Sequence, residues 1–442
     1  MPSIRDNSPT ATIQPSTAIA STSGRIERRR RGVFRFTVVL AVGLGTIAWL
    51  GRSTDPAAKP LAAGPLTLGA AIALTGNANL YGQDQRMGLT LAERWYRGLG
   101  ASRKHDQAEV RPLRLQIEDG ASDEASAIAA FNLLIRQGVI ALIGPTLSQQ
   151  AFAADPIPQR LGVPVVAPSN TAKGIPQIGH FISRVSAQGS VIAPLSIDEA
   201  LRRDPSIRRV ALFYAQDDAY STAEISIFQK ALQARGLTPV TVQRTQLADN
   251  DFQTPITSAL QDQPQLVVIS VQAVAGGNLI RQLRELGYKG QIVVGNGLNT
   301  PNIYPICQRW CDGILIAQAY SPELNTPINR SFRRLFRQSY GAQPPPQITA
   351  QAFTAYQVLA EALQRLEHKG GLSGVTLGQA RARLMDELLA GRYETPLGTI
   401  RFTPDGEVVQ SRFYVAEVQM APGGRDGRFA LVRERQLEGV QP

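Results

Sequence analysis

Few residues in this sequence could carry out catalysis. The chain holds three histidines, His105, His180 and His368, and none of them stands at a spacing that suits a metal site or an activated nucleophile. The sequence has no glycine-rich phosphate loop that ends in lysine, and Gly295-Asn296-Gly297 lacks the third glycine of a dinucleotide turn. We therefore expect no enzymatic activity, no cofactor and no metal site.

The two cysteines, Cys307 and Cys311, are four residues apart. In an oxidising compartment such a pair can close a small disulfide loop. A metal site would need further thiolate or imidazole ligands, and the nearest histidine in the sequence is His368. We expect a disulfide between the two cysteines.

The length and the charge of the chain narrow its class. With 442 residues, 43% of them hydrophobic, the chain exceeds one ordinary domain and can bury a large core. The formal net charge is +11, but residues 1–65 alone carry nine Lys and Arg against three Asp and Glu. The later basic residues are dispersed among acidic ones, and aromatic residues make up only 6% of the chain. These features argue against nucleic-acid binding.

Residues 1–51 have the composition of a targeting segment. Residues 1–31 are polar and end in a run of four arginines, Arg28 to Arg31, which indicates a disordered basic region on the cytoplasmic side. An apolar run at 36–50 follows, which is the order of the charged and hydrophobic regions of an export signal. Segment 32–51 is therefore a signal peptide or a signal-anchor helix, and residues 52–65 form a linker.

Both interpretations of segment 32–51 fit the sequence. Its apolar run of fifteen residues spans about 22 Å as a helix, which is short of the roughly 30 Å of a bilayer core. Small-residue cleavage candidates lie at Ala57-Ala58 and Ala62-Ala63, and the lack of a cysteine near them excludes a lipoprotein anchor. We expect the rest of the chain in the periplasm, held at the inner membrane if the segment is retained.

Predicted strands and helices alternate twice along the chain. The first series has strands at 66–74, 113–118, 139–143 and 163–167, with helices at 88–99, 124–137 and 147–161. The second series has strands at 210–214, 240–244, 266–270 and 291–294, with helices at 187–202, 221–235, 251–261 and 277–286. Such alternation is typical of crossovers onto a parallel sheet. The sequence therefore predicts an α/β fold with two doubly wound lobes.

The pattern changes after residue 313. A strand at 314–318 precedes helices at 328–340, 351–366 and 377–389, and a β-hairpin is expected over 398–403 and 408–418. We expect these helices to return to the first lobe, so that several strands form the hinge. The predicted division is 66–186 with 319–396 as the first lobe, 187–318 with 397–420 as the second, and 421–442 as a C-terminal tail.

Over residues 66–420 the chain resembles the type I periplasmic solute-binding proteins of the leucine/isoleucine/valine class, the substrate-binding components of branched-chain amino acid ABC transporters. Six segments in order carry the resemblance: Leu74-Thr75-Gly76 with Tyr81-Gly82, Asp119-Gly120, Leu142-Ile143-Gly144-Pro145 with Ser148, residues 162–171, Asp217-Asp218-Ala219-Tyr220, and residues 396–406. Each is a weak pattern alone, and their order and spacing make the match specific.

The resemblance implies that Ser148, Ser169 and Thr171 hold the carboxylate of a ligand. Ser148 stands at a strand-to-helix turn, where unpaired backbone N–H groups favour an anion. Ser169 and Thr171 follow the next strand, at the same edge of the sheet, where open α/β sheets bind ligands. The plainer alternatives are a helix cap for Ser148 and an ordinary polar turn for the other two.

The resemblance also implies that Tyr81 and Tyr220 cover the ligand. Two positions depart from the family pattern. Asn296 stands where the amino-acid binders carry an acid that pairs with the ligand's ammonium, and Gln272 stands where several carry tyrosine. Because a buried unpaired cation is costly, either Asp217 or Asp218 supplies the counter-charge or the ligand is not an α-amino acid.

Two functional hypotheses follow from these residues. In the first, the chain is the extracytoplasmic substrate-binding component of an ABC importer, which closes around a small amphipathic amino acid or amide and delivers it to membrane permease subunits. In the second, a membrane-anchored sensor or regulatory interaction module reuses the same fold. The mass of the mature protein separates them, because a start near Ala58 or Ala63 indicates a diffusible transport component.

Overall fold

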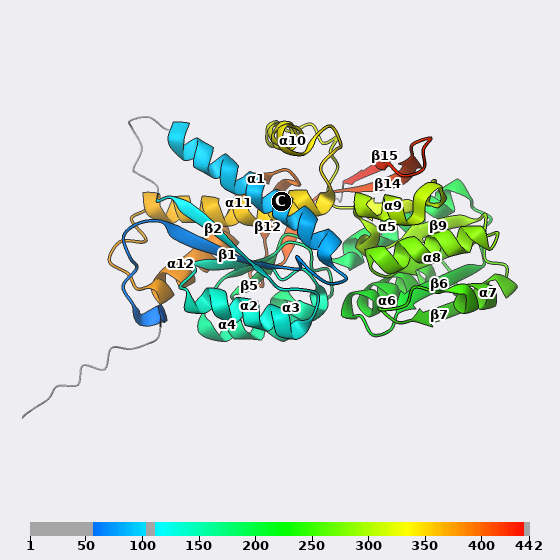
Figure 1. The fold of residues 1–442 in the computed structure, drawn as a ribbon, viewed down its shortest axis with the longest axis horizontal. Helices are drawn as coiled ribbons and strands as arrows, with labels where there is room; N and C mark the ends of the chain where they lie inside the picture. The colour runs from blue at the N-terminus through cyan, green and yellow to red at the C-terminus, as the bar shows by residue number, and fades with distance from the viewer. Residues whose placement is uncertain (1–55, 103–110, 437–442) are drawn as a thin grey trace, which may run out of the picture. The chain divides into compact units, whose positions relative to one another are not determined.

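The structure is a computed structural model that describes residues 56–102 and 111–436 (Figure 1). The predictions for residues 1–31 and for segment 32–51 lie outside the described residues. Within the described ranges, none of the helices has the length and apolarity needed to cross a membrane. Residues 59–61, part of the predicted linker, pair with the turn that precedes a late helix: Leu61 N donates to Val375 O at 2.9 Å.

The first lobe is built on a parallel sheet with the order β2-β1-β3-β4-β5. Its strands are β1 (Leu66–Ile72), β2 (Leu113–Asp119), β3 (Ala141–Ile143), β4 (Val165–Ala167) and β5 (Ile182–Arg184). Its helices are α1 (Asn79–Ser102), α2 (Glu124–Arg136), α3 (Ser148–Ala154) and α4 (Pro156–Leu161). Leu68, Ala70 and Ile72 of β1 share a core with α1, whereas Ala71 packs with α2 and α3 on the other face.

The second lobe is built on a mixed sheet with the order β15-β14-β10-β9-β8-β6-β7. Its strands are β6 (Val210–Ala215), β7 (Thr241–Thr245), β8 (Leu266–Ser270), β9 (Gln291–Val294), β10 (Leu315–Gln318), β14 (Arg412–Met420) and β15 (Gly427–Gln436). Its helices are α5 (Gly189–Arg203), α6 (Ala219–Gln233), α7 (Gln253–Gln261), α8 (Ala273–Glu285) and α9 (Tyr304–Cys307). Strands β6 to β10 pair in parallel, and β14 and β15 are antiparallel additions.

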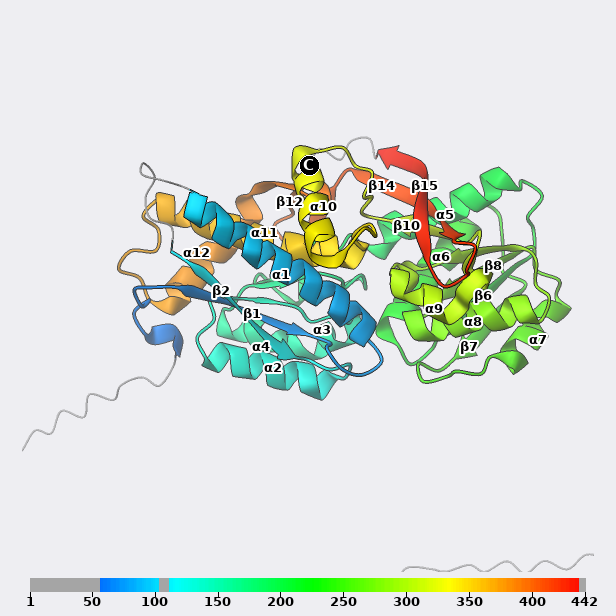
Figure 2. The ribbon, with the colours of Figure 1, turned by 45° about the horizontal axis from the view of Figure 1, so that its top comes forward.

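The later helices pack on the first lobe. They are α10 (Pro327–Tyr340), α11 (Gln347–His368) and α12 (Leu377–Ala390), followed by a small antiparallel sheet of β11 (Arg392–Thr395), β12 (Gly398–Phe402) and β13 (Val408–Gln410). Helix α11 lies alongside α1 in both views (Figures 1 and 2). Tyr356, Leu384, Tyr393 and Ile400 join the core of the first sheet. The two doubly wound α/β lobes are therefore confirmed.

Three chain segments connect the lobes: 185–188 after β5, 319–326 after β10, and residue 411 between β13 and β14. A separate apolar cluster, which includes Ala187, Ala319 and Phe413, lies at these connections. The Gln410 amide donates to Ala319 O at 2.6 Å and to Arg412 O at 2.8 Å, and so ties two of the connections together. This is the multi-strand hinge that the sequence leads us to expect.

Helix α1 begins nine residues earlier than the predicted helix at 88–99. The predicted helix begins only at Gly88, and the glycines at 82 and 88 are poor helix formers. In the structure, a Cβ on Gly88 would lie 2.2 Å from Thr349 O of α11, so glycine is what allows the two helices to pack closely. The earlier start puts Tyr81 on a helix rather than in a loop.

Two other predicted elements differ from the structure. The single helix expected at 147–161 is divided into α3 and α4 at Pro156, which has no N–H to continue the hydrogen-bond ladder. Residues 397–420, expected in the second lobe, are split: β12 and β13 pack on the first lobe, and only β14 joins the second sheet. The expected tail contains β15, which pairs with β14 along its length.

A charged cluster attaches β15 to the second lobe. The Glu199 carboxylate of α5 is almost fully buried and accepts hydrogen bonds from Arg202 at 2.6 Å, Arg433 of β15 at 2.8 Å and Arg203 at 3.2 Å. The bond from Arg202, followed by those from Arg433 and Arg203, lowers the pKa of Glu199 to about 2. The ionised carboxylate is therefore part of the folded structure at neutral pH.

We predict that Glu199→Gln lowers the free energy of unfolding by roughly 2–3 kcal/mol at pH 7, because a pKa that is depressed in the folded state contributes stability above the ordinary carboxyl pKa. That contribution is lost as pH falls from about 4.5 toward 2, so the difference from wild type shrinks between pH 5 and pH 3. Urea unfolding at several pH values measures it. The exposed Glu285→Gln serves as control, and a difference that does not change with pH would contradict the assignment.

Candidate functional site

One cavity lies where the two lobes meet, at the carboxyl ends of their parallel strands. Its lining includes all seven residues predicted from the sequence: Tyr81, Ser148, Ser169, Thr171, Tyr220, Gln272 and Asn296. Thr146, Leu147, Gly297 and Ile348 complete it. The cavity volume is about 40 Å³, well below the roughly 300 Å³ at which ligand pockets begin. The lobes must therefore separate before a metabolite can enter.

The first-lobe side of the cavity presents backbone donors. The N–H groups of Thr171 and Ala172 both donate to the Ser148 hydroxyl oxygen, each at 3.3 Å. Ser148 and Thr171 are buried, and Ser148 is the first residue of α3. The two successive N–H groups converge on the Ser148 hydroxyl oxygen, and such a pair of backbone donors is suited to a carboxylate oxygen.

Ser169 lines the cavity, and its hydroxyl also makes hydrogen bonds within the protein. Its hydroxyl donates to Thr146 O at 2.6 Å and accepts from the Gln85 amide at 2.8 Å, while Gln85 Oε1 accepts from the Thr146 hydroxyl at 2.6 Å. These bonds occupy the Ser169 hydroxyl in holding two loops together. Gln85 is not among the residues predicted from the sequence, although it stands four residues after Tyr81, on the same face of α1.

Tyr81 reaches from the first lobe into the second. Its hydroxyl donates to Gly297 O at 2.6 Å and accepts from Ala273 N at 2.7 Å. Burial raises the pKa of Tyr81, so the hydroxyl is neutral and keeps the proton that it donates. Tyr81 therefore fastens the closed arrangement as well as lining the cavity.

Tyr220 binds the same glycine from the second lobe. Its hydroxyl accepts from Gly297 N at 2.5 Å and donates to the Glu224 carboxylate. Glu224 also accepts from Asn296 N at 2.9 Å and from the Ser270 hydroxyl at 3.0 Å. Glu224 is buried, and desolvation raises its pKa. The Glu224 carboxyl group thus lies behind Asn296, whose own side chain is an amide.

The two aspartates named from the sequence lie differently. Asp218 is buried beside the cavity, and its Oδ1 accepts from the Gln272 amide at 3.3 Å. Desolvation raises the pKa of Asp218. Asp217 instead accepts from Leu247 N at 2.7 Å, away from the lining. The cavity lining contains no Lys, Arg or His, so Asp218 and Glu224 are carboxyl groups without a cationic partner in it.

Asn296 lines the cavity but has a protein partner for its side chain. Its Oδ1 accepts from the Gln347 amide at 3.0 Å, at the start of α11. Glu224 is not among the residues predicted from the sequence, because it stands at a regular position of a predicted helix and looks like a solvent-exposed acid. Its spacing of four residues from Tyr220 is the one signal that could have identified it.

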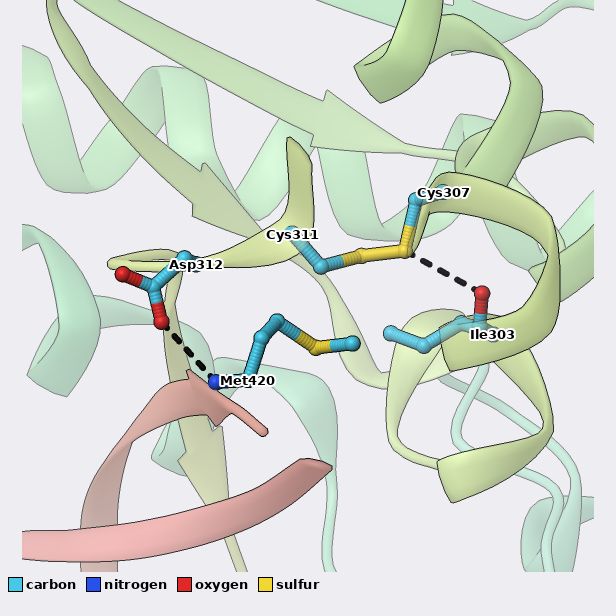
Figure 3. The surroundings of a disulfide bond; sticks show 5 residues. All are labelled: Ile303, Cys307, Cys311, Asp312 and Met420. Carbon is cyan, nitrogen blue, oxygen red and sulfur yellow. Dashed lines mark hydrogen bonds between the residues drawn. A yellow bond between two sulfur atoms is a disulfide. The ribbon is translucent and has the colours of Figure 1, made fainter. Parts of the chain in front are cut away.

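The cysteines lie apart from the cavity lining. Cys307 and Cys311 are joined by a disulfide, and Cys307 Sγ contacts Ile303 O at 3.1 Å (Figure 3). Asp312, the next residue, accepts from Met420 N at 2.9 Å and so connects this loop to the end of β14 (Figure 3). In the described ranges no three His, Cys, Asp or Glu side chains lie close enough to hold a metal ion.

We predict that Tyr81→Phe shifts the ligand-free protein toward an open arrangement. The change removes two hydrogen bonds between the lobes and leaves Gly297 O and Ala273 N unpaired, which costs about 1–3 kcal/mol in the closed arrangement. Small-angle X-ray scattering should show a larger radius of gyration than for wild type. The control is Tyr340→Phe, which alters a more exposed tyrosine on α10. Equal radii for Tyr81→Phe and wild type would refute the role assigned to Tyr81.

Known proteins share this architecture. The model of the periplasmic binding protein family matches residues 65–427. A Leu/Ile/Val-binding protein homolog of Brucella melitensis is 21% identical over 354 residues, which cover 79% of this chain and 90% of the relative. Two solved structures have a TM-score of 0.71: a branched-chain amino acid transporter substrate-binding protein from Streptococcus pneumoniae in complex with isoleucine, and a solute-binding protein from R. palustris in complex with benzoate.

Those two structures are 20% and 19% identical to this chain, cover 83% and 85% of it, and are each covered to 99%. At such identity they show a common fold. The family model extends from the first strand of the first lobe to the start of β15, and so includes both lobes, the hinge and the cavity. The chain belongs to the periplasmic binding protein family.

Proposed function

We propose that this protein is the extracytoplasmic substrate-binding component of an ABC importer and that its ligand is a small zwitterionic amino acid with an apolar side chain. The observation that carries the proposal is the cavity between the lobes, which is lined by the seven residues named from the sequence. A ligand held there contacts both lobes at once, so its binding energy favours the closed state over the open one.

The distribution of polar groups around the cavity fits a zwitterion. The first lobe offers the Thr171 and Ala172 N–H groups and the Ser148 hydroxyl, which suit a carboxylate. Behind the lining residues Gln272 and Tyr220, the second lobe holds the carboxyl groups of Asp218 and Glu224, which suit an ammonium group. Leu147 and Ile348, together with the rings of Tyr81 and Tyr220, supply apolar surface for a side chain.

The same arrangement argues against a simple carboxylic acid. The R. palustris relative was solved with benzoate, so this fold also accepts ligands that have no ammonium group. In the present chain such a ligand would leave Asp218 and Glu224 without a cation, in a cavity that offers no Lys, Arg or His. Burying unpaired charge is costly, and the acids would have to stay protonated.

The fold and the family support delivery to membrane permease subunits outside the cytoplasm. The three connections between the lobes permit hinge closure, and the apolar run at 36–50 after an arginine cluster serves export in this proposal. The alternative of a regulatory module assumes a vestigial pocket. The convergence of both lobes on one lined cavity favours the transport role instead.

We predict that isothermal titration calorimetry detects binding of an aliphatic amino acid such as L-leucine and at least tenfold weaker binding of 4-methylpentanoate, which lacks the ammonium group. Glu224→Gln and Asp218→Asn should each weaken leucine binding by about tenfold, since each removes a charge-assisted contact. Asp217→Asn is the matched control, because its carboxylate faces Leu247. Equal affinity for the two compounds would contradict a zwitterion site.

The affinity for leucine should also rise with pH above the ordinary carboxyl pKa. Burial raises the pKa of Asp218 and Glu224 in the free protein, whereas a bound ammonium group favours their ionised forms. Binding then releases protons, and a higher pH favours it until both groups are ionised. Titrations in buffers of different ionisation enthalpy measure this release, and proton uptake on binding would contradict the assignment.

A further inference from the structure

The loop that carries the Thr171 and Ala172 donors is held from behind by a buried arginine. Arg184, the last residue of β5, is fully buried. Its Nη1 donates to Asn170 O at 3.2 Å and to Ala172 O at 2.7 Å. Its Nε and Nη2 donate to the two carboxylate oxygens of Glu407 at 2.9 and 2.7 Å. One guanidinium therefore binds two carbonyls of the loop and one carboxylate.

These contacts determine where the loop's N–H groups point. A trans peptide is planar, and its C=O and N–H point in opposite directions. Because Arg184 and the Ser186 hydroxyl hold Asn170 O on one side, the Thr171 N–H points the other way, toward Ser148 and the cavity. Arg184 also binds Ala172 O, which belongs to the next peptide, so the peptides on both sides of the one that carries the Ala172 N–H are held in place.

Glu407 belongs to a turn far away in the sequence. The turn over 403–407 joins β12 to β13, and Arg184 N donates to Gly406 O at 3.1 Å. Gly406 has φ of 84°, and a Cβ there would lie 2.2 Å from Ile182 O, so only glycine lets the turn pack against β5. The turn therefore holds Glu407 in the position from which it orients the Arg184 guanidinium.

Arginine is required here by its donor geometry. The guanidinium offers five N–H donors in a fixed plane, and the contacts to Glu407 and to the two carbonyls use both edges of that plane. Lysine would keep the charge but offers one point of attachment. Because Glu407 neutralises the guanidinium charge, Arg184 acts on the site through geometry.

We propose that Arg184, oriented by Glu407, is a positioning residue that directs the Thr171 and Ala172 N–H groups toward the ligand's carboxylate. The inference rests on the proposed function, since it assigns a role in the same site. A positioning residue differs from a residue that only stabilises the fold in one respect. Substitution of Arg184 must weaken ligand binding more than a substitution elsewhere in the first lobe that lowers stability by the same amount.

The test uses Arg184→Lys and the double variant Arg184→Met/Glu407→Gln, which avoids leaving a buried carboxylate unpaired. Arg381→Met is the matched control, because Arg381 is also a fully buried arginine of the first lobe and donates to Val139 O at 2.6 Å, at the opposite end of the sheet. Thermal unfolding, L-leucine affinity by calorimetry, and the amide resonance of Thr171 in the ligand-free full chain are measured for each.

We expect both Arg184 variants to bind leucine roughly ten- to a hundredfold more weakly than wild type, since a misdirected donor to a charged group costs that much. The affinity of Arg381→Met for leucine should stay within about twofold of wild type, at a similar loss of melting temperature. Affinity losses no larger than that of Arg381→Met would overturn the proposal. If wild type binds no amino acid, the proposed function fails, and the resonance decides: a shifted Thr171 amide in Arg184→Lys supports positioning, and an unchanged one overturns it.

Discussion

The backbone of Gly297 is where the two lobes are joined across the cavity. Tyr81 of the first lobe donates to its carbonyl, and Tyr220 of the second lobe accepts from its N–H. Both polar groups of one residue are thereby fixed by phenol side chains from different lobes. Each phenol in turn binds a further group, Ala273 N for Tyr81 and Glu224 for Tyr220. The closed arrangement depends on these contacts together with the bond from the Gln347 amide to Asn296 Oδ1.

The electrostatic asymmetry of the site follows from which element each lobe contributes. In the first lobe, loops after β3 and β4 turn backbone N–H groups toward the cavity. In the second lobe, the first turns of α6 place Asp218 and Glu224 behind the lining residues Gln272 and Tyr220, and burial keeps their pKa values raised. Such a site is polarised from one lobe to the other, which favours a ligand with separated charges and orients it.

Much of the fold and of the cavity lining could be predicted from the sequence, because both depend on local signals. Strand and helix periodicity indicates the two lobes, and residues that follow parallel strands meet at one edge of the sheet. Gln85, Glu224 and Arg184 could not be predicted in this way. Each acts through a tertiary contact, with Ser169, Asn296 N and Asn170 O respectively, and the only local signal among them is the spacing of four residues between Tyr220 and Glu224. The sequence predicts the start of α1 too late for the same reason, because the glycine at position 88 is required by a tertiary contact, its close packing against α11.

A crystal structure of the protein with a bound amino acid tests the central claim most directly. The account predicts that the ligand's carboxylate lies within hydrogen-bonding distance of Thr171 N and the Ser148 hydroxyl. It also predicts that the ammonium group lies on the side of Asp218 and Glu224, beneath Tyr81 and Tyr220. A ligand bound in the reverse orientation, or one without an ammonium group bound tightly in the same cavity, would contradict it.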